Sequence, residues 1–289
     1  MAPTETLPLV ALDDGDIAGC MALSAEAGWN QSPDDWKLFL EHGTVFGLRD
    51  AAGRPVATGA ILPYREGFAW IGMVLVTASR RRARIGTRIL ETCCRELTQR
   101  GLVALLDATP AGEQVYRPLG FEPIFRLTRW QGMGGGRAVP AIPAPGIPAP
   151  GIRRMQETDL AAVVDLDAET CGAQRPFLLQ NFYRRVPNLA FITTSGDGFA
   201  MARTGRLATQ IGPIIAESET TAAILLDAAL DAAAGPVFLD VCDRWDGLVR
   251  QLERRNFTVQ RPFLRMALRR LTPFGDAMRT FSIAGPEYG

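Results

Sequence analysis

A stretch dominated by glycine, proline and alanine, residues 131–151, interrupts the middle of the 289-residue chain. Its prolines lack the amide hydrogen that a helix interior or a central strand needs, and they favour extended polyproline conformations. The stretch is therefore typical of a linker. We expect two domains of ordinary size, residues 1–130 and 152–289, joined by a linker at 131–151.

The two halves share residues at one constant offset. Asp16, Ala18, Ala25, Glu26, Pro33 and Phe39 recur as Asp159, Ala161, Ala168, Glu169, Pro176 and Phe182. The offset holds without a gap across two expected helices, which predicts an internal duplication.

Composition excludes several classes of protein. The hydrophobic content is 47% and the formal net charge is +0, which argues against disorder and against nucleic-acid binding through bulk positive charge. We see no membrane-spanning run and no signal peptide, and the odd count of 5 cysteines favours a reducing cytoplasm. His42 is the only histidine and Lys37 the only lysine, so we expect no metal site and no Walker-type phosphate loop.

Hydrophobic periodicity predicts the same order of elements in both halves. In the first half we expect helices at 16–27, 33–42 and 84–99, and strands at 44–48, 55–62, 68–77 and 121–130. This order predicts an α+β fold in which each domain is a mixed, mostly antiparallel, splayed sheet with helices on both faces.

The segment Trp70–Leu90 reads WIGMVLVTASRRRARIGTRIL, a strand that enters a basic turn and then a helix. A helix start of this kind directs backbone N–H groups and the positive end of the helix dipole at one point, which suits a pyrophosphate. The arginines of the turn match phosphate geometry. The alternative is a solvated, arginine-rich helix start.

The same segment resembles the GNAT superfamily of acyl-CoA-dependent N-acyltransferases, whose signature is Arg/Gln-x-x-Gly-x-Gly/Ala. Arg81 to Gly86 match it, except that Arg84 stands in place of the first glycine. Arg84 either extends over the phosphates or blocks them. The resemblance implies that acetyl-CoA is bound by the loop and by the preceding strand, at Met73, Val74, Val76, Arg81, Arg82, Ala83, Arg84, Ile85, Gly86 and Thr87.

A second motif, from Ala111 to Phe121, is similar to the Tyr-x-x-x-Gly-Phe corner of the superfamily. The resemblance implies that the hydroxyl of Tyr116 lies near the coenzyme sulfur and stabilises the departing thiolate. The strand amide near Leu75 would polarise the thioester carbonyl. The alternative for Tyr116 is a half-buried residue whose hydroxyl caps a core position.

The residues that recognise the amine are less defined, and the sequence identifies neither the acceptor nor the general base. Candidates are Trp29, Asn30, Gln31, Asp107, Thr109, Thr209 and Gln210. The alternative for Trp29 is a residue that covers the core between helices, and the alternative for Thr209 and Gln210 is a hydrogen-bonded pair on a sheet face. We expect a small-molecule acceptor and no nucleic-acid or membrane partner, and the oligomeric state stays open.

The second half keeps the strand-to-helix junction and loses both motifs. Its turn is acidic, at Glu217 and Glu219, and Leu252 stands four residues before the corner, where the first half has Tyr116. We therefore expect an N-terminal GNAT acyl-CoA-binding catalytic domain and a degenerate GNAT-like C-terminal domain. The function predicted is N-acetyltransferase; the alternative is a non-catalytic protein that binds acyl-CoA or a metabolite and regulates a partner.

Overall fold

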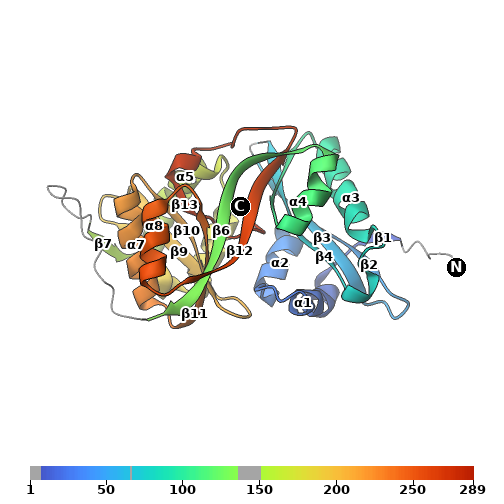
Figure 1. The fold of residues 1–289 in the computed structure, drawn as a ribbon, viewed down its shortest axis with the longest axis horizontal. Coiled ribbons are helices and arrows are strands. Elements are labelled where there is room, and N and C mark those ends of the chain that lie inside the picture. The colour runs from blue at the N-terminus through green and yellow to red at the C-terminus, as the bar shows by residue number, and fades with distance from the viewer. Residues whose placement is uncertain (1–7, 66, 136–150) are drawn as a thin grey trace. The chain divides into compact units, whose positions relative to one another are not determined.

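A computed structural model describes residues 8–65, 67–135 and 151–289 (Figure 1). The chain divides into two compact units. Unit 1 comprises Met1–Pro63 and Gly67–Leu106, and unit 2 comprises Tyr64–Glu66 and Asp107–Gly289. Each unit is described by itself.

Unit 1 is built on a sheet in the order β1-β2-β3-β4-β5. The strands are β1 (Leu9–Ala11), β2 (Thr44–Arg49), β3 (Pro55–Tyr64), β4 (Phe68–Val76) and β5 (Val103–Ala108), the last residue of β3 and the last two of β5 counting with unit 2. The helices are α1 (Ile17–Glu26), α2 (Pro33–His42) and α3 (Ile85–Gln99). β1–β2 and β2–β3 pair antiparallel, whereas β4–β5 pair parallel.

Local signals explain the helices of unit 1. Ser32 caps α2 by accepting from the Asp35 amide while the Asp35 carboxylate accepts from the Ser32 amide, and Pro33 occupies the first turn. In α3 the apolar positions Ile89, Leu90, Cys93 and Leu97 are fully buried, as the period of 3.6 residues predicts. These two helices therefore agree with the sequence expectation.

Unit 2 is built on a longer sheet in the order β12-β6-β11-β13-β10-β9-β8-β7. The strands are β6 (Phe121–Gly134), β7 (Ile152–Arg154), β8 (Phe191–Thr193), β9 (Gly198–Arg203), β10 (Thr209–Ala216), β11 (Gly235–Cys242), β12 (Thr258–Leu268) and β13 (Thr280–Ser282). The helices are α4 (Pro110–Tyr116), α5 (Leu160–Cys171), α6 (Pro176–Arg185), α7 (Glu219–Ala232) and α8 (Asp246–Arg254). The predicted mixed, mostly antiparallel fold class is confirmed in both units, with β10–β11 as the parallel pair of unit 2.

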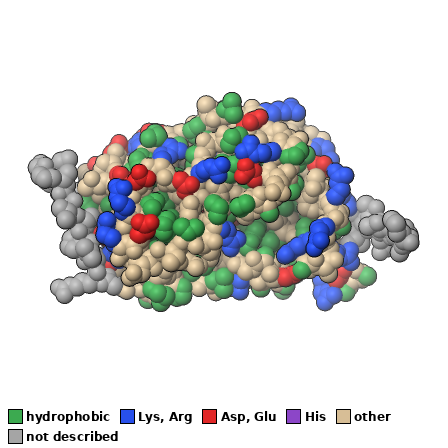
Figure 2. All heavy atoms as spheres, viewed as in Figure 1, with side chains coloured by type: hydrophobic (Ala, Val, Ile, Leu, Met, Phe, Trp, Pro, Cys, Tyr) green, Lys and Arg blue, Asp and Glu red, His purple; other side chains and the backbone are tan. Residues whose placement is uncertain are grey.

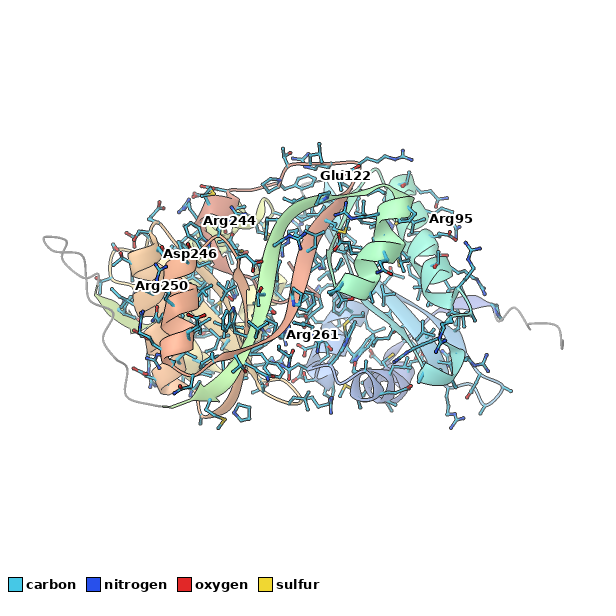
Figure 3. The ribbon with its side chains drawn as sticks, in the orientation of Figure 1. Arg95, Glu122, Arg244, Asp246, Arg250 and Arg261 are labelled. Atoms are coloured by element: carbon cyan, nitrogen blue, oxygen red, sulfur yellow. The ribbon has the colours of Figure 1, made fainter. Side chains whose placement is uncertain are left out.

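The two faces of the unit 2 sheet differ in chemistry. Ile211 and Leu239 pack with α7 in one apolar core. In α8, Leu248 is buried in the same core, whereas Asp246 and Arg250 point outward (Figure 3). Because successive residues of a strand alternate faces, the neighbours Gln210 and Asp240 lie on the opposite face.

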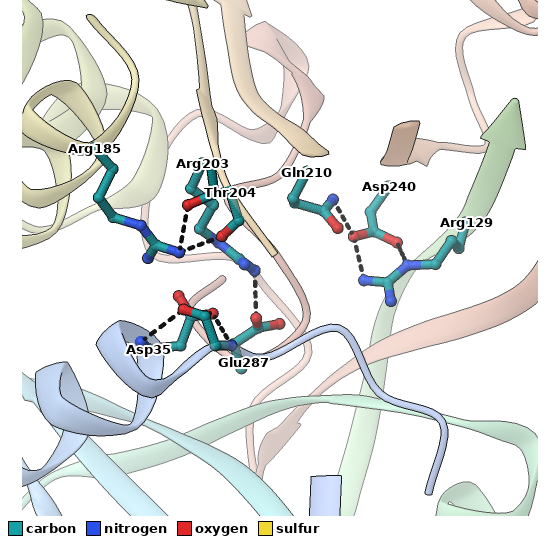
Figure 4. Close-up of polar contacts among 9 residues, drawn as sticks. Asp35, Arg129, Arg185, Arg203, Thr204, Gln210, Asp240 and Glu287 are labelled. Atoms are coloured by element: carbon teal, nitrogen blue, oxygen red, sulfur yellow. Dashed lines mark hydrogen bonds and ion pairs between the residues drawn. The ribbon is translucent and has the colours of Figure 1, made fainter. Parts of the chain in front are cut away.

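That opposite face holds buried ion pairs. Arg129 donates through Nε and Nη2 to the two carboxylate oxygens of Asp240, at 2.8 Å each, and Gln210 Nε2 donates to Asp240 Oδ2 at 3.0 Å. Arg203 pairs with Glu287 nearby in the same unit (Figure 4). Arg129 is 5% exposed and Asp240 0%. Charges this deeply buried persist in proteins only when paired and hydrogen-bonded.

The boundary expected at residue 130 differs from the division that the structure shows. β6 continues to Gly134, past the expected end of the first domain, and pairs antiparallel with β11 and β12. The chain from Asp107 onward therefore packs with the second half. Of the expected linker 131–151, residues 136–150 lie outside the described residues.

Residues at the constant offset occupy matching places in the two units. The Asp16 carboxylate accepts from the Asp13 amide and pairs with Arg49, and the Asp159 carboxylate accepts from the Gln156 amide and pairs with Arg153. Phe39 and Phe182 are both fully buried, and Pro33 and Pro176 both begin a helix. These matches support the duplication predicted from the sequence.

Candidate active site

Strand β4 provides an open backbone edge in unit 1. Its parallel pairing with β5 covers Phe68–Trp70 opposite Val103–Leu105 and goes no further. Met73 then adopts a left-handed φ of 57°, and its carbonyl accepts from the buried Thr58 hydroxyl at 2.9 Å. Met73 therefore interrupts the extended backbone of β4. After Met73, Val74 and Val76 are partly exposed, whereas Leu75 is 5% exposed.

The loop after β4 has an unusual backbone. Arg82 has a φ of 63° and Arg84 a φ of 57°, the left-handed region that glycine adopts most readily. Arg84 thus adopts a backbone conformation that favours glycine, and its side chain is exposed to solvent. Residues held in such conformations concentrate at functional sites.

The N-terminus of α3 is suited to an anion. No side chain of the described residues caps it, and its first turn contains no acidic residue. The amides of Ile85, Gly86 and Thr87 precede the first helical hydrogen bond, from Arg88 N–H to Arg84 C=O at 3.0 Å. By contrast, α2, α4 and α7 are each capped by a hydroxyl and carry acidic residues in the first turn. The positive helix end of α3 is therefore available to a phosphate group.

Gly86 leaves space at this helix end. A Cβ atom placed on Gly86 would meet only Val76 Cγ2 within 4 Å, at 3.7 Å, which is an ordinary van der Waals distance. Packing within unit 1 does not demand glycine here. The missing side chain instead opens the first turn of α3, and the residues present fit the pyrophosphate of a coenzyme A.

Tyr116 ends α4 and belongs to unit 2. Its ring lies 5.9 Å from the ring of Phe121, centroid to centroid, and it is half-buried. Thr109, one of the acceptor candidates, caps the same helix by accepting from the Gly112 amide at 3.2 Å. Thr109 therefore has a structural task in holding the helix that carries Tyr116.

The acceptor candidates of unit 1 lie between α1 and α2. Asn30 and Gln31 are buried, with 2% and 4% exposure, and Trp29 is half-buried. Gln31 Oε1 is buried without a hydrogen-bond partner in the part of the chain that the structure describes. Such an oxygen usually has a partner in a native protein, which makes Gln31 the strongest ligand-contact candidate of the three.

The acceptor candidates of unit 2 separate from one another. Thr209 and Gln210 are successive residues of β10, so they face opposite sides of the sheet. Gln210 donates to Asp240, and its Oε1 atom is buried without a partner among the described residues. Asp107 accepts two hydrogen bonds from Arg265, at 2.9 and 2.8 Å, and burial raises the pKa of its carboxyl. Asp107 is thus committed to an ion pair.

Comparisons with known proteins identify the family. The model of the acetyltransferase (GNAT) family matches residues 22–121, and a second acetyltransferase (GNAT) domain model matches residues 163–281. The chain belongs to the GNAT acetyltransferase family. The two matches cover most of the chain, so the tandem arrangement and the acyltransferase class predicted from the sequence are confirmed.

The relatives of this GNAT protein include proteins of similar length, and one of the solved structures is a tandem GNAT protein. An uncharacterized N-acetyltransferase of Bacillus subtilis, YitH, is 22% identical and covers 81% of each chain. The holothin acyltransferase of a Pseudoalteromonas species is 24% identical and covers 99% of this chain and 95% of its own. Among solved structures, a putative acetyltransferase of Pyrococcus horikoshii has a TM-score of 0.78 at 19% identity, covering 100% of this chain and 98% of its own. The tandem GNAT protein of clavulanic acid biosynthesis has a TM-score of 0.62 at 14% identity, with 90% and 98% covered.

The second GNAT domain has its own parallel strand pair, but the space between the strands is filled. β10 and β11 pair at Thr209–Ile211 opposite Val237–Leu239. Beyond that point β13 lies between them, and Ser282 pairs with both Ile214 and Val241. A Cβ on Gly212 would come 2.0 Å from the Ile283 carbonyl oxygen, so the chain passes too close for any side chain there.

The helix that follows β10 is also closed to an anion. Ser218 caps α7 by accepting from the Thr221 amide at 3.2 Å. Glu219 lies in the first turn, and its carboxylate accepts from the Gly247 and Leu248 amides at the start of α8. The acidic turn seen in the sequence therefore supplies caps to two helices.

Sequence reasoning missed two features of the GNAT sheets. Thr58 lies within the apolar run of β3, and its hydroxyl donates to the carbonyl of the left-handed Met73. A polar residue in that run was the signal that could have predicted this contact. β13 has only 3 residues and offers no periodic pattern, so its place between two distant strands was not predictable.

The thiols offer no nucleophile. Burial raises the pKa of each cysteine, to about 12 for Cys20 and Cys242, to about 11 for Cys94, and above the usual range for Cys93 and Cys171. A thiol attacks a thioester as the thiolate, so an acyl-cysteine intermediate is disfavoured. Across the described residues, no group of three or more His, Cys, Asp or Glu side chains is arranged to bind a metal ion, and no helix has the length and apolar character of a membrane span.

Proposed function

We propose that this GNAT protein transfers the acetyl group of acetyl-CoA directly to an amine of a small molecule, and that unit 1 binds the coenzyme. The observation that carries the proposal is the combination of an uncapped, acid-free start of α3 with the open edge of β4. The amides of Ile85 to Thr87 and the arginines of the loop would hold the pyrophosphate. Met73, Val74 and Val76 would pair with the pantetheine arm.

The reaction follows from these groups. The neutral amine nitrogen attacks the thioester carbonyl carbon, whose oxygen is polarised by the amide near Leu75. The C–S bond then breaks, an amide forms, and the amine proton leaves to a base or to water. The Tyr116 hydroxyl would hydrogen-bond or protonate the thiolate that departs.

The acceptor would be recognised by groups of unit 1 at Trp29, Asn30 and Gln31. We leave Asp107 out because its carboxylate is bound to Arg265. A small-molecule amine is supported by the holothin acyltransferase, a relative of nearly the same length. We place the enzyme in the cytoplasm, in line with its odd number of cysteines.

Isothermal titration calorimetry with acetyl-CoA tests the proposal. We expect one molecule bound per chain, with a Kd in the low micromolar range, about −8 kcal/mol. One site is expected because β13 fills the corresponding space in unit 2. Two equivalent sites would show that the second domain also binds acetyl-CoA. No binding would overturn the proposal that the protein is an acetyl-CoA-dependent enzyme.

Tyr116→Phe separates catalysis from binding. We expect turnover to fall about tenfold, less than a typical general acid because a thiolate is a fair leaving group. Acetyl-CoA affinity should stay unchanged, since the ring and its contact with Phe121 remain. Steady-state kinetics with an acceptor found by an amine library screen provides the measurement. Tyr183→Phe, on α6, is the matched control. Unchanged turnover in Tyr116→Phe would remove this hydroxyl from the mechanism.

A further inference from the structure

Glu26 occupies an unfavourable place for a carboxylate in unit 1. It is the last residue of α1, where the negative end of the helix dipole lies, and the last turn contains no basic residue. An acidic side chain at this end costs helix stability. Its presence therefore calls for an interaction elsewhere.

That interaction is with the turn after β4. Glu26 Oε1 accepts from the Ala78 amide at 2.5 Å, and Oε2 accepts from the Thr77 hydroxyl at 2.8 Å. Ala78 begins the short 3-10 helix Ala78–Arg80, so Glu26 acts as its N-terminal cap from another element. The Ala78 amide, then the Thr77 hydroxyl, lowers the pKa of the Glu26 carboxyl, and Arg81 adds to the effect. The carboxylate is therefore ionised at neutral pH.

Further hydrogen bonds connect this cap to the loop of Arg81–Thr87. The Thr77 amide donates to the Val56 carbonyl at 2.9 Å, and Arg81 Nε donates to the Val76 carbonyl at 3.1 Å. Three residues after Arg81, the left-handed Arg84 is the N-cap residue of α3. Glu26 is thus the one side chain of α1 that hydrogen-bonds to the segment leading into the start of α3, as far as the described residues show.

We propose that Glu26 is a positioning residue for the coenzyme. By capping the Ala78–Arg80 turn, it holds the loop of Arg81–Thr87 in the conformation in which the α3 amides converge on the pyrophosphate. This inference rests on the proposed function, because it concerns the same site.

The duplicate of Glu26 provides a control. Glu169, at the end of α5, pairs with Arg279, and Arg279 also pairs with Glu217, which directly follows β10. In unit 2 the helix end is therefore linked to the equivalent turn through an arginine. Removing Glu169 disturbs a similar link in a unit that we expect not to bind the coenzyme.

The sign of the effect on affinity distinguishes positioning from simple charge. Glu26 is an anion close to a site for an anion, so if it acted only through its charge, Glu26→Ala would bind acetyl-CoA more tightly. If it positions the loop, Glu26→Ala raises the Kd for acetyl-CoA, by about tenfold for the loss of a cap of this kind. The acetyl-CoA KM should rise likewise, while kcat at saturating acetyl-CoA changes less than about twofold.

The experiment compares wild type, Glu26→Ala, Glu26→Gln and Glu169→Ala by calorimetric titration with acetyl-CoA and by thermal unfolding. Glu26 lines an open cavity of about 740 Å³, so water can replace its carboxylate and we expect the variant to fold. Glu26→Gln keeps one acceptor without the charge and should fall between wild type and Glu26→Ala. Glu169→Ala should bind as wild type does.

Thr77→Val removes one of the two hydrogen bonds to the Glu26 carboxylate and tests whether both act through the same contact. It should raise the Kd by about threefold, and the double variant with Glu26→Ala should bind no worse than Glu26→Ala alone, because the two groups act through one contact. If the wild type binds acetyl-CoA and Glu26→Ala binds it with the same or higher affinity, the positioning role of Glu26 is wrong and the proposed function stands. Wild type that fails to bind overturns the proposed function itself.

Discussion

Gly86→Glu abolishes measurable acetyl-CoA binding while the protein remains folded: this is the largest change in affinity that we expect. A Cβ at Gly86 lies 3.7 Å from Val76 Cγ2, so the added side chain fits without moving the sheet. The new carboxylate would cap the first turn of α3 itself and repel a pyrophosphate. We expect a loss of at least about 100-fold, or about 2.7 kcal/mol. Calorimetric titration measures it.

Two variants control for bulk and for charge. Gly86→Ala adds the Cβ without charge and should keep most of the affinity. Gln99→Glu adds the same charge at the last residue of α3, which is exposed, and should bind acetyl-CoA within about twofold of wild type, because charges separated by more than a Debye length are screened. The melting temperature of Gly86→Glu should be at least that of wild type. Normal binding by Gly86→Glu would exclude the start of α3 from the coenzyme site.

Arg129→Met should cause the largest loss of stability. It removes the partner of Asp240, a carboxylate with 0% exposure, and leaves Gln210 as the one remaining donor among the contacts described above. Breaking a buried pair from one side typically costs about 3–5 kcal/mol, since a charge is left without compensation. Equilibrium unfolding in guanidinium chloride gives the free energy of unfolding.

The double variant Arg129→Met/Asp240→Leu tests the cause. With both charges gone, most of the stability should return, because the loss in the single variant comes from the unpaired carboxylate rather than from the pair. The exposed pair Lys37–Glu41 is the control, and Lys37→Met should change stability little. If the double variant were as unstable as Arg129→Met, packing by the arginine, which lies over Phe238 and Phe263, would be the main contribution.

Elements specified by neighbouring residues were predictable. α2 begins at Pro33 and ends at His42 as expected, because its cap, its first-turn proline and its acidic first turn lie within a few residues. α3 and its buried face followed from periodicity. The junction from β4 to α3 was also recognisable, since the chain order of strand, arginines and helix is itself the signal.

Elements that depend on pairing with distant segments of the chain were not predictable from the sequence. β6 was expected to end at Trp130, yet pairing with β11 and β12 carries it to Gly134 and places the chain from Asp107 onward in unit 2. The candidate site was affected in the same way. Asp107 was a candidate for contact with the acceptor, and Arg265, far along the chain, occupies its carboxylate.

The amino-acid sequence by itself determined the α+β class, the duplication, the tandem GNAT family and the residues at the start of α3. Each depends on local order, on periodicity or on a short motif. Only the tertiary structure decided that Arg84 takes a left-handed conformation, that β13 fills the strand opening of unit 2, and that Glu26 caps the turn between β4 and α3. These features depend on hydrogen bonds and packing between residues that are far apart in the sequence. Such contacts produce no periodic pattern in a single sequence.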